Sequence, residues 1–259
     1  MSVPRCLTIA GSDSGGGAGI QADLKAFARA GCHGMTAIVA LTAQNTSGVA
    51  AVHEVPPEFV TAQLSAVFDD FGVDAAKTGM LFSRALIETV AEYLERHRVP
   101  LVVDPVLVAS SGARLLQEDA VGSLVARLFP LATVVTPNLP EAEALAGRAG
   151  TRRELAERLH ELGAAAVIVT GGHGAEAVDH LFDGTKHLEI PVERHGVAAT
   201  HGAGCTHSAT LAAELAKGAT LADAARTAAR IASDAVAHGL AELGAGQGPV
   251  DVLNLRAAS

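Results

Sequence analysis

The sequence predicts an α/β fold in which a mostly parallel central sheet is covered by helices on both faces. Short apolar runs such as residues 6–10 and 165–169 lack the polar alternation of half-exposed strands, which is typical of parallel strands buried on both faces. Longer segments with helical spacing lie between these runs, and the alternation covers nearly the whole chain. This order indicates βαβ units with right-handed crossovers. Because no linker or repeat interrupts it, we expect residues 1–259 to form a single domain.

Each predicted element follows from its own sequence pattern. Apolar runs predict strands at residues 6–10, 35–41, 101–103, 132–135 and 165–169. Apolar residues at spacings of three and four, a proline at a helix start, and alanine-rich stretches predict helices over residues 18–30, 57–71, 83–98, 118–128, 152–162, 208–217 and 221–240. Residues 175–192 break the alternation with two strand-like runs around Asp183 and Gly184. This pair is typical of a hairpin turn.

Composition excludes several classes of protein. The 259 residues include 28 acidic and 19 basic side chains, a net charge of −9, and only 3% aromatic residues. Nucleic-acid binders need clustered cations and stacking rings, so we expect no nucleic-acid partner. The longest uncharged stretch, residues 30–53, contains Gln44 and Asn45, so we expect no membrane span. Three scattered cysteines and the lack of a signal-peptide pattern predict a cytoplasmic protein.

The first strand is followed by a glycine-rich loop, GSDSGGGAG, at residues 11–19. A P-loop is excluded because no Lys follows its last glycine, and a dinucleotide site is disfavoured because the acidic ribose partner is missing. A tight turn without a ligand stays open. We favour a substrate-facing loop whose backbone approaches the ligand, with Asp23 placed to bind a ring amine or hydroxyl.

Polar residues follow two further predicted strands. Gln44 carries one acceptor and two donors, which suits an aminopyrimidine edge, although a solvated turn is an equal alternative. Asp104, Asn138 and Glu141 follow the strands at 101–103 and 132–135. Their oxygens are ligands of the kind Mg²⁺ takes, directly or through water. Asn138 and Glu141 also fit a helix cap with a first-turn acid, and the two interpretations are compatible.

The segment THGAGCTHS at residues 200–208 opens an alanine-rich helix. Small residues there expose unpaired amides, so Gly202, Ala203, Gly204 and Cys205 predict a pocket for a transferred phosphoryl group. At a helix N-terminus Cys205 is expected to have a depressed thiol pKa and to act as a base. A buried structural cysteine is the alternative. Six histidines between 173 and 207 match no zinc spacing, so we expect surface or loop histidines.

The segments GSDSGGGAGIQADLKAF, LTAQNT, KTGM, DPVLVASSG, TPNLPEAEAL, GGH and THGAGCTHSA together resemble the bacterial hydroxymethylpyrimidine/phosphomethylpyrimidine kinases of thiamine synthesis. The resemblance runs in order from about residue 6 to residue 240. It implies a ribokinase-like three-layer αβα fold, ATP and Mg²⁺ as cofactors, and a homodimer. It also implies two steps, in which the hydroxymethylpyrimidine becomes a monophosphate and then a diphosphate.

The same resemblance implies roles for individual residues. The pyrimidine maps onto Gln44, with Gly11, Ala18, Asp23, Met80 and Cys205 nearby. The anion hole maps onto residues 202–205, with Cys205 in the place where most ribokinase relatives carry an Asp base. Nucleotide binding maps onto Asp104, Asn138, Glu141 and Thr170, and the magnesium ion onto Asp104 and Glu141.

Two positions depart from the family pattern. Thr170 and Ser110 stand where many members carry Lys, so a nucleotide contact and the diphosphate-forming step are less securely implied. Pyridoxal kinases share much of the glycine-rich and THGAGCT segments, and pyridoxal kinase or dual activity is the alternative function. Gln44 favours the pyrimidine, because pyridoxal-type relatives tend to place an apolar residue there. A sugar kinase and a non-catalytic binding protein fit less well.

Overall fold

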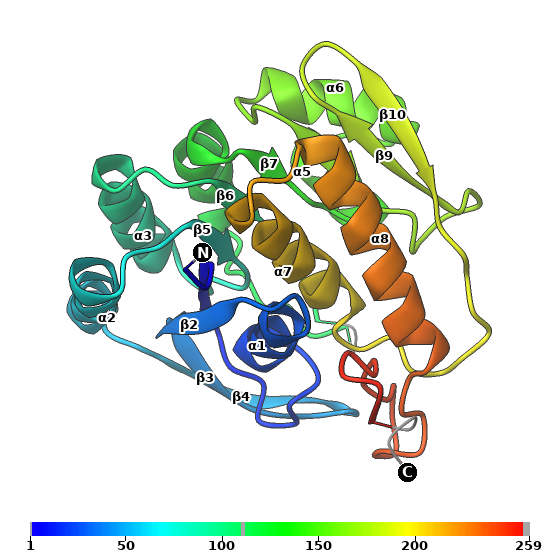
Figure 1. The fold of residues 1–259 in the computed structure, drawn as a ribbon, viewed down its shortest axis with the longest axis horizontal. Helices are drawn as coiled ribbons and strands as arrows, with labels where there is room; N and C mark the ends of the chain where they lie inside the picture. Colours follow the sequence, from blue (N-terminus) through cyan, green and yellow to red (C-terminus); the bar gives the residue numbers. More distant parts are fainter. Residues whose placement is uncertain (1, 110–111, 256–259) are drawn as a thin grey trace.

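The structure, a computed structural model, describes residues 2–109 and 112–255 (Figure 1). Within these residues an eight-stranded sheet has the order β10-β9-β8-β7-β6-β5-β1-β2, and β3 and β4 form a separate two-stranded sheet. The strands are β1 (Arg5–Ala10), β2 (His33–Ile38), β3 (Ala40–Asn45), β4 (Gly48–Glu54), β5 (Ala75–Thr78), β6 (Leu101–Val103), β7 (Val134–Val135), β8 (Val167–Val169), β9 (Val178–Phe182) and β10 (His187–Pro191).

Helices cover both faces of the large sheet, as the sequence predicts. They are α1 (Gly19–Arg29), α2 (Pro57–Asp70), α3 (Arg84–Arg96), α4 (Ala120–Ser123), the π-helical η1 (Leu124–Leu128), the 3₁₀ η2 (Phe129–Leu131), α5 (Leu139–Ala146), α6 (Arg152–Glu161), α7 (Ala203–Ala216) and α8 (Leu221–Ala237). Figure 1 shows α7 and α8 side by side across one face, and α1 packs against α7. The three-layer αβα arrangement is confirmed.

Consecutive strand residues enter different cores. Cys6 and Val102 belong to the apolar cluster beneath α1, α7 and α8, whereas Leu7 and Val103 belong to the cluster beneath α2, α3, α5 and α6. This follows from the two-residue period of a strand, and it explains why the strand sequences are apolar without alternation. Hydrophobic burial on both faces therefore holds the sheet between its helix layers.

Five neighbouring pairs of strands, from β2 through β1, β5, β6 and β7 to β8, are parallel. Their carboxyl ends lie along one edge of the sheet, and each end is followed directly by a loop. Ligands bind outside this edge in open α/β sheets. The topology thus brings together the glycine-rich loop after β1, Asp104 after β6 and Thr170 after β8.

The predicted strand at 35–41 is wrong in its extent. The first strand ends at Ile38, and β3 begins at Ala40 in the small antiparallel sheet with β4. The chain changes direction at Val39, whose amide donates to the Ala10 carbonyl oxygen at 3.1 Å. Gln44 therefore lies within a hairpin strand and not at the end of a core strand. Antiparallel pairing of β9 with β10 confirms the hairpin predicted around Asp183.

Two other elements differ from the sequence-based expectation. Strand β5 was not predicted, because the charged Lys77 interrupts its short apolar run. The helix expected over 118–128 is a single α-turn followed by a π segment and by a 3₁₀ turn that contains Pro130. Proline has no amide hydrogen to continue an α-helical ladder. Ser110 lies outside the described residues. None of the helices in the described ranges is long and apolar enough to cross a membrane.

Candidate active site

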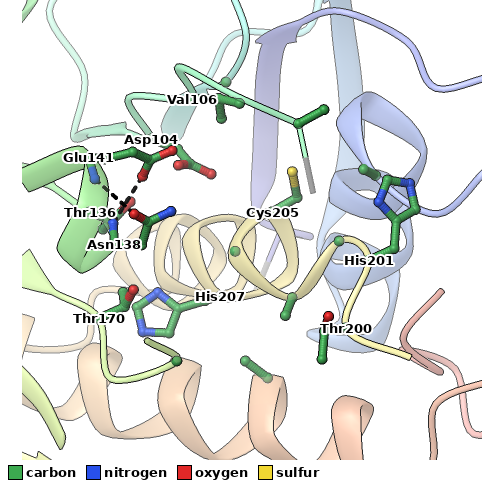
Figure 2. A pocket seen from close by; sticks show the side chains of 18 of the residues that line it. Asp104, Val106, Thr136, Asn138, Glu141, Thr170, Thr200, His201, Cys205 and His207 are labelled. Atoms are coloured by element: carbon green, nitrogen blue, oxygen red, sulfur yellow. Dashed lines mark hydrogen bonds between the residues drawn. The ribbon is translucent and has the colours of Figure 1, made fainter. Parts of the chain in front are cut away.

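A cavity of about 680 Å³ lies at the carboxyl edge of the sheet, between the glycine-rich loop and the start of α7. Figure 2 shows Asp104, Asn138 and Glu141 on one side of it and Cys205 and His201 on the other. Almost all of the site residues expected from the sequence line this cavity. They are Gly11, Ala18, Gln44, Met80, Asp104, Asn138, Glu141, Thr170, Gly202, Ala203, Gly204 and Cys205. Long-range topology, and not sequence proximity, gathers them.

Asp23 is the exception among the expected residues. It lies on the inward side of α1, fully buried beneath the cavity, and is not among the residues that line it. Its carboxylate accepts hydrogen bonds from Lys77 Nζ at 2.9 and 3.0 Å and from Thr8 Oγ1 at 2.6 Å. Because these partners occupy it, the expectation that Asp23 binds a substrate amine or hydroxyl needs correction. Its contacts instead hold Lys77.

Lys77 is a residue that the sequence analysis missed as part of the site. Its side chain is fully buried, lines the cavity floor, and lies 3.8 Å from Asp104 Oδ2 in addition to its contacts with Asp23. Burial alone would lower the pKa of Lys77, but the charges of Asp23 and Asp104 hold it above its ordinary value. The cavity therefore has a permanent cation at its base. A lysine within a short strand-like run of small residues is the signal that could have found it.

Gln44 projects from β3 beside the glycine-rich loop. Its backbone is joined to that loop by Ser14 Oγ, which accepts from the Gln44 amide at 2.8 Å and donates to the Gln44 carbonyl oxygen at 2.7 Å. The side-chain oxygen accepts from Thr42 Oγ1 at 3.3 Å. The side-chain amide nitrogen has no partner in the described part of the chain, so it remains able to donate to a ligand.

The start of α7 has the geometry of an anion-binding helix end. Gly202 precedes the helix with φ of +87°, and no side chain caps it. The Ala203 amide is already used, because it donates to the Thr200 carbonyl oxygen at 3.1 Å. Among the described residues the amides of Gly204 and Cys205 have no acceptor, and the helix dipole adds partial positive charge there. Within residues 202–205, Ala203 is thus the residue whose amide is already used and not available to an anion.

The expected pKa of Cys205 is wrong in direction. Burial raises the pKa of the Cys205 thiol to about 12, although the charge of Lys77 opposes that shift. The negative charges of Asp23 and Asp104 add to the effect of burial. The partial positive charge of the helix N-terminus does not overcome burial and these negative charges, so at neutral pH the unliganded protein holds Cys205 as a thiol. Proton transfer to Cys205 requires ligands that change its surroundings.

Asp104 and Glu141 bring two carboxylates to the other side of the cavity. Burial and the nearby charge of Asp104 raise the pKa of Glu141 to about 8. Glu141 also accepts from the Asn138 amide at 2.9 Å while Asn138 Oδ1 accepts from the Glu141 amide at 2.9 Å, so the predicted helix cap is confirmed. Asp104 Oδ2 accepts from Ser208 Oγ at 2.8 Å, which ties it to α7.

The oxygen atoms on this side suit a hard cation. The Thr136 hydroxyl, which lies nearby in Figure 2, is buried without a hydrogen-bond partner in the described residues. No group of three His, Cys, Asp or Glu side chains in that part of the chain is arranged to hold a metal ion. Two carboxylates with few other protein ligands match the way Mg²⁺ keeps waters and binds through substrate phosphates.

The histidine expectation is wrong for His180 and His207, which are buried within β9 and α7, whereas His201 lies in the loop before α7 as expected. His201 and His207 line the cavity and are buried, and His180 is buried in β9. His207 Nε2 contacts Asp179 Oδ2 at 3.1 Å, and Asp179 Oδ1 accepts from the Gly171 amide at 2.6 Å. This contact fixes the loop that carries Thr170. The spacing of the histidines alone could not show which of them pair with a carboxylate that is distant in the sequence.

Comparisons with known proteins agree with this geometry. The model of the phosphomethylpyrimidine kinase family matches residues 13–251. A hydroxymethylpyrimidine/phosphomethylpyrimidine kinase of Rhizobium meliloti is 50% identical over 252 residues, which cover 94% of this chain and 95% of the relative. The chain belongs to the phosphomethylpyrimidine kinase family.

Solved structures extend the comparison. Phosphomethylpyrimidine kinase from Clostridium difficile has a TM-score of 0.80 and 38% identity, covering 91% of this chain and 100% of that chain. An ADP complex of Bacillus subtilis pyridoxal kinase has a TM-score of 0.90 and 39% identity, covering 98% and 99%. Both matches support the ribokinase-like fold. One of these two similar structures is named a phosphomethylpyrimidine kinase and the other a pyridoxal kinase, so the same fold occurs in kinases named for two different aromatic substrates.

Proposed function

We propose that this protein transfers a phosphoryl group from ATP to the hydroxymethyl group of 4-amino-5-hydroxymethyl-2-methylpyrimidine and then phosphorylates the monophosphate to the diphosphate for thiamine biosynthesis. The observation that carries the proposal is the meeting of Gln44, the glycine-rich loop and the Gly204 and Cys205 amides in one cavity. This phosphoryl transfer needs a side chain that binds the heterocycle and a helix N-terminus that binds the transferred phosphoryl group.

The acceptor binds beneath the glycine-rich loop in this proposal. Gln44 donates its free amide to a ring nitrogen and offers its side-chain oxygen to the ring amine, while Gly11, Ala18 and Met80 supply close apolar walls. These small groups allow the ring to approach the backbone closely. The hydroxymethyl group then points toward Cys205 and the first turn of α7.

ATP binds along the carboxyl edge with its γ-phosphoryl group at the Gly204 and Cys205 amides. Asn138 and Thr170 lie on the nucleotide side, and Asp104 and Glu141 would hold a magnesium ion through water. That ion would neutralise charge on the phosphate oxygens when bound. Lys77 adds a fixed positive charge from below the cavity.

In the proposed mechanism Cys205 accepts the hydroxymethyl proton as a thiolate, after its own thiol proton has passed to solvent when the ligands bind. With a thiol pKa of about 12, Cys205 is protonated before ligands bind. The loose transition state of phosphoryl transfer places little demand on early proton removal. Positioning of the two reactants and stabilisation of phosphate charge therefore provide most of the rate, and proton transfer follows late.

Turnover assays with three acceptors test this proposal. The purified protein is incubated with Mg·ATP and, separately, hydroxymethylpyrimidine, its monophosphate and pyridoxal, and ADP release and product mass are measured. Turnover of both pyrimidines is the expected result. Turnover of the first pyrimidine alone would limit the protein to one step, which would fit Thr170 and Ser110 in place of lysines.

Pyridoxal kinase activity is the second candidate, favoured by the 39% identity and TM-score of 0.90 to the Bacillus subtilis pyridoxal kinase. Turnover of pyridoxal without either pyrimidine would replace the main proposal. The homodimer stays a prediction of the family resemblance, and the cytoplasmic location stays a prediction from the cysteine content and the lack of a signal-peptide pattern. Light scattering coupled to size-exclusion chromatography measures the first, and cell fractionation measures the second.

A further inference from the structure

His201 and Asp13 form a buried contact between two loops that are 188 residues apart in the chain. His201 Nε2 lies 2.8 Å from Asp13 Oδ2, and both side chains border the cavity. The same carboxylate accepts hydrogen bonds from the amides of Gly15 at 2.8 Å, Gly17 at 3.0 Å and Ala18 at 2.8 Å. One acidic side chain therefore organises the glycine-rich loop and binds it to the segment that precedes α7.

The electrostatics of this contact favour an ionised carboxylate. Burial alone would raise the pKa of Asp13, but the hydrogen bonds from His201, Ala18 and Gly15 hold it below its ordinary value. A carboxylate that receives several N–H donors is held in a defined orientation, and charge-assisted hydrogen bonds are stronger than neutral ones. The contact is therefore directional and not simply a packing contact.

The backbones of the two loops also touch. A Cβ atom on Gly202 would lie 1.8 Å from the Gly17 carbonyl oxygen, and one on Gly17 would lie 2.4 Å from His201 Cδ2. Neither position has room for a side chain, and Gly202 has a positive φ in addition. The loops consequently meet at a fixed separation, with the His201–Asp13 contact setting their alignment.

These loops carry opposite halves of the proposed reaction. The glycine-rich loop ends at Ala18 against the acceptor, and the segment after His201 supplies the Gly204 and Cys205 amides for the phosphoryl group. We propose that the His201–Asp13 contact is a positioning latch that aligns the acceptor hydroxyl with the transferred phosphoryl group, an inference that rests on the proposed function. Reacting atoms must approach to about 3–3.5 Å with aligned orbitals, so a small displacement between the loops costs rate.

Two substitutions at His201 test the latch. His201→Leu keeps bulk but removes the donor, whereas His201→Gln keeps an N–H donor at the end of a side chain of similar reach. We expect His201→Leu to lower kcat for pyrimidine phosphorylation about 100-fold and His201→Gln to recover most of that loss. The KM for ATP stays within about twofold in both variants, because the nucleotide side is unchanged.

A coupling measurement separates positioning from loss of structure. The ratio of ADP formed to phosphorylated pyrimidine is measured for each variant, together with the melting temperature. A misaligned acceptor raises this ratio in His201→Leu, because water takes a larger share of the phosphoryl groups. General destabilisation would lower both products together and leave the ratio unchanged. His97→Leu is the matched control, because His97 caps the end of α3 outside the cavity lining and contacts the Tyr93 carbonyl oxygen and the rings of Phe68 and Tyr93.

The outcomes distinguish the latch from the proposed function. Normal kcat and coupling in His201→Leu, beside an active wild-type enzyme, would overturn the latch alone. An equal loss in the Leu and Gln variants with unchanged coupling would also overturn it. A wild-type enzyme that phosphorylates neither the pyrimidines nor pyridoxal would overturn the proposed function and the latch with it.

Discussion

On the acceptor side of the cavity, Asp13 receives hydrogen bonds from three loop amides and from His201, and Ser14 joins the loop to Gln44. On the nucleotide side, Asp104 and Glu141 place two carboxylates near each other, and the Thr136 hydroxyl has no partner among the described residues. The polar groups of the glycine-rich loop on the acceptor side thus have their partners within the fold. On the nucleotide side, the carboxylates of Asp104 and Glu141 repel each other, and a bound cation would relieve that repulsion. A site that must orient a small neutral ring benefits from a rigid wall. One that receives a charged metal–nucleotide complex is completed by its ligand.

The cavity floor beneath both sides provides the strongest test of the comparison. We expect Lys77→Met to destabilise the protein by about 3–5 kcal/mol, because it leaves Asp23 as an uncompensated buried charge. Urea unfolding followed by circular dichroism measures the change. The double variant Lys77→Met with Asp23→Leu removes both charges and should recover much of the lost stability.

A control for this prediction is Lys217→Met, which removes a cation from a half-exposed pair with Glu214. Pairs of this kind contribute about 0–1 kcal/mol, so little change is expected. If Lys77→Met proves as stable as wild type, the buried Lys77–Asp23 ion pair does not stabilise the structure beneath the cavity.

Cys205 stands where the two sides meet, and its removal should affect turnover more than binding. We expect Cys205→Ala to lower kcat about 100-fold while the KM values for pyrimidine and ATP change little. Steady-state assays with each substrate varied measure this. Near-normal turnover would remove Cys205 from the proton-transfer step.

The state of the Cys205 thiol can be measured separately in the ligand-free protein. Because its pKa is raised to about 12, the thiol stays protonated from pH 7 to 9 and its alkylation by iodoacetamide should be slow there. The rate should climb as the pH approaches 12. Rapid labelling of Cys205 at pH 7.5, located by peptide mass, would show that burial does not raise the pKa of this thiol.

Glu141→Gln should make the nucleotide side more stable and less able to support catalysis. The folded-state pKa of Glu141 is raised to about 8, so between roughly pH 4.5 and 8 the folded protein binds more protons than the unfolded chain. Wild-type stability therefore falls as pH rises through this window. The variant carries no charge, so its stability advantage over the wild type grows as the pH rises and is largest at pH 8.5.

Thermal unfolding at pH 5 and pH 8.5 measures that advantage, with Glu143→Gln on the same helix as the control. Glutamine keeps an oxygen for the Asn138 amide, so the helix cap survives. We also expect Glu141→Gln to require more Mg²⁺ for half-maximal turnover. An unchanged magnesium requirement would remove Glu141 from the proposed cation site.

Gln44→Leu should produce the smallest effect and sharpen the choice of acceptor. Loss of the ring contacts is expected to raise the KM for hydroxymethylpyrimidine about 10-fold, equivalent to about 1.4 kcal/mol. The KM for pyridoxal should stay equal or fall. Ala43→Leu, at an exposed position of the same strand, controls for a change in the structure of β3. An unaltered KM for the pyrimidine in Gln44→Leu would show that Gln44 does not bind the ring.

Sequence reasoning located most of the candidate site because its residues follow strand ends, and parallel strands end at one edge. It failed where a contact joins distant segments. Asp23 looked free beside a glycine-rich loop, yet Lys77 reaches it from a strand 54 residues away. His201 gave no signal of its partner Asp13, and the sequence left open whether Cys205 is buried.

By itself the sequence determined the alternation of strands and helices, the glycine-rich turns and the local cap of Asn138 and Glu141, because each depends on neighbours within a few residues. Only the tertiary structure decided the strand order, the separate hairpin that carries Gln44, and the protonation of Cys205. The physical reason is that pairing across the sheet and removal from water depend on groups brought together by folding. Hydrogen bonds and charges act over a few ångströms of space, whatever their separation along the chain.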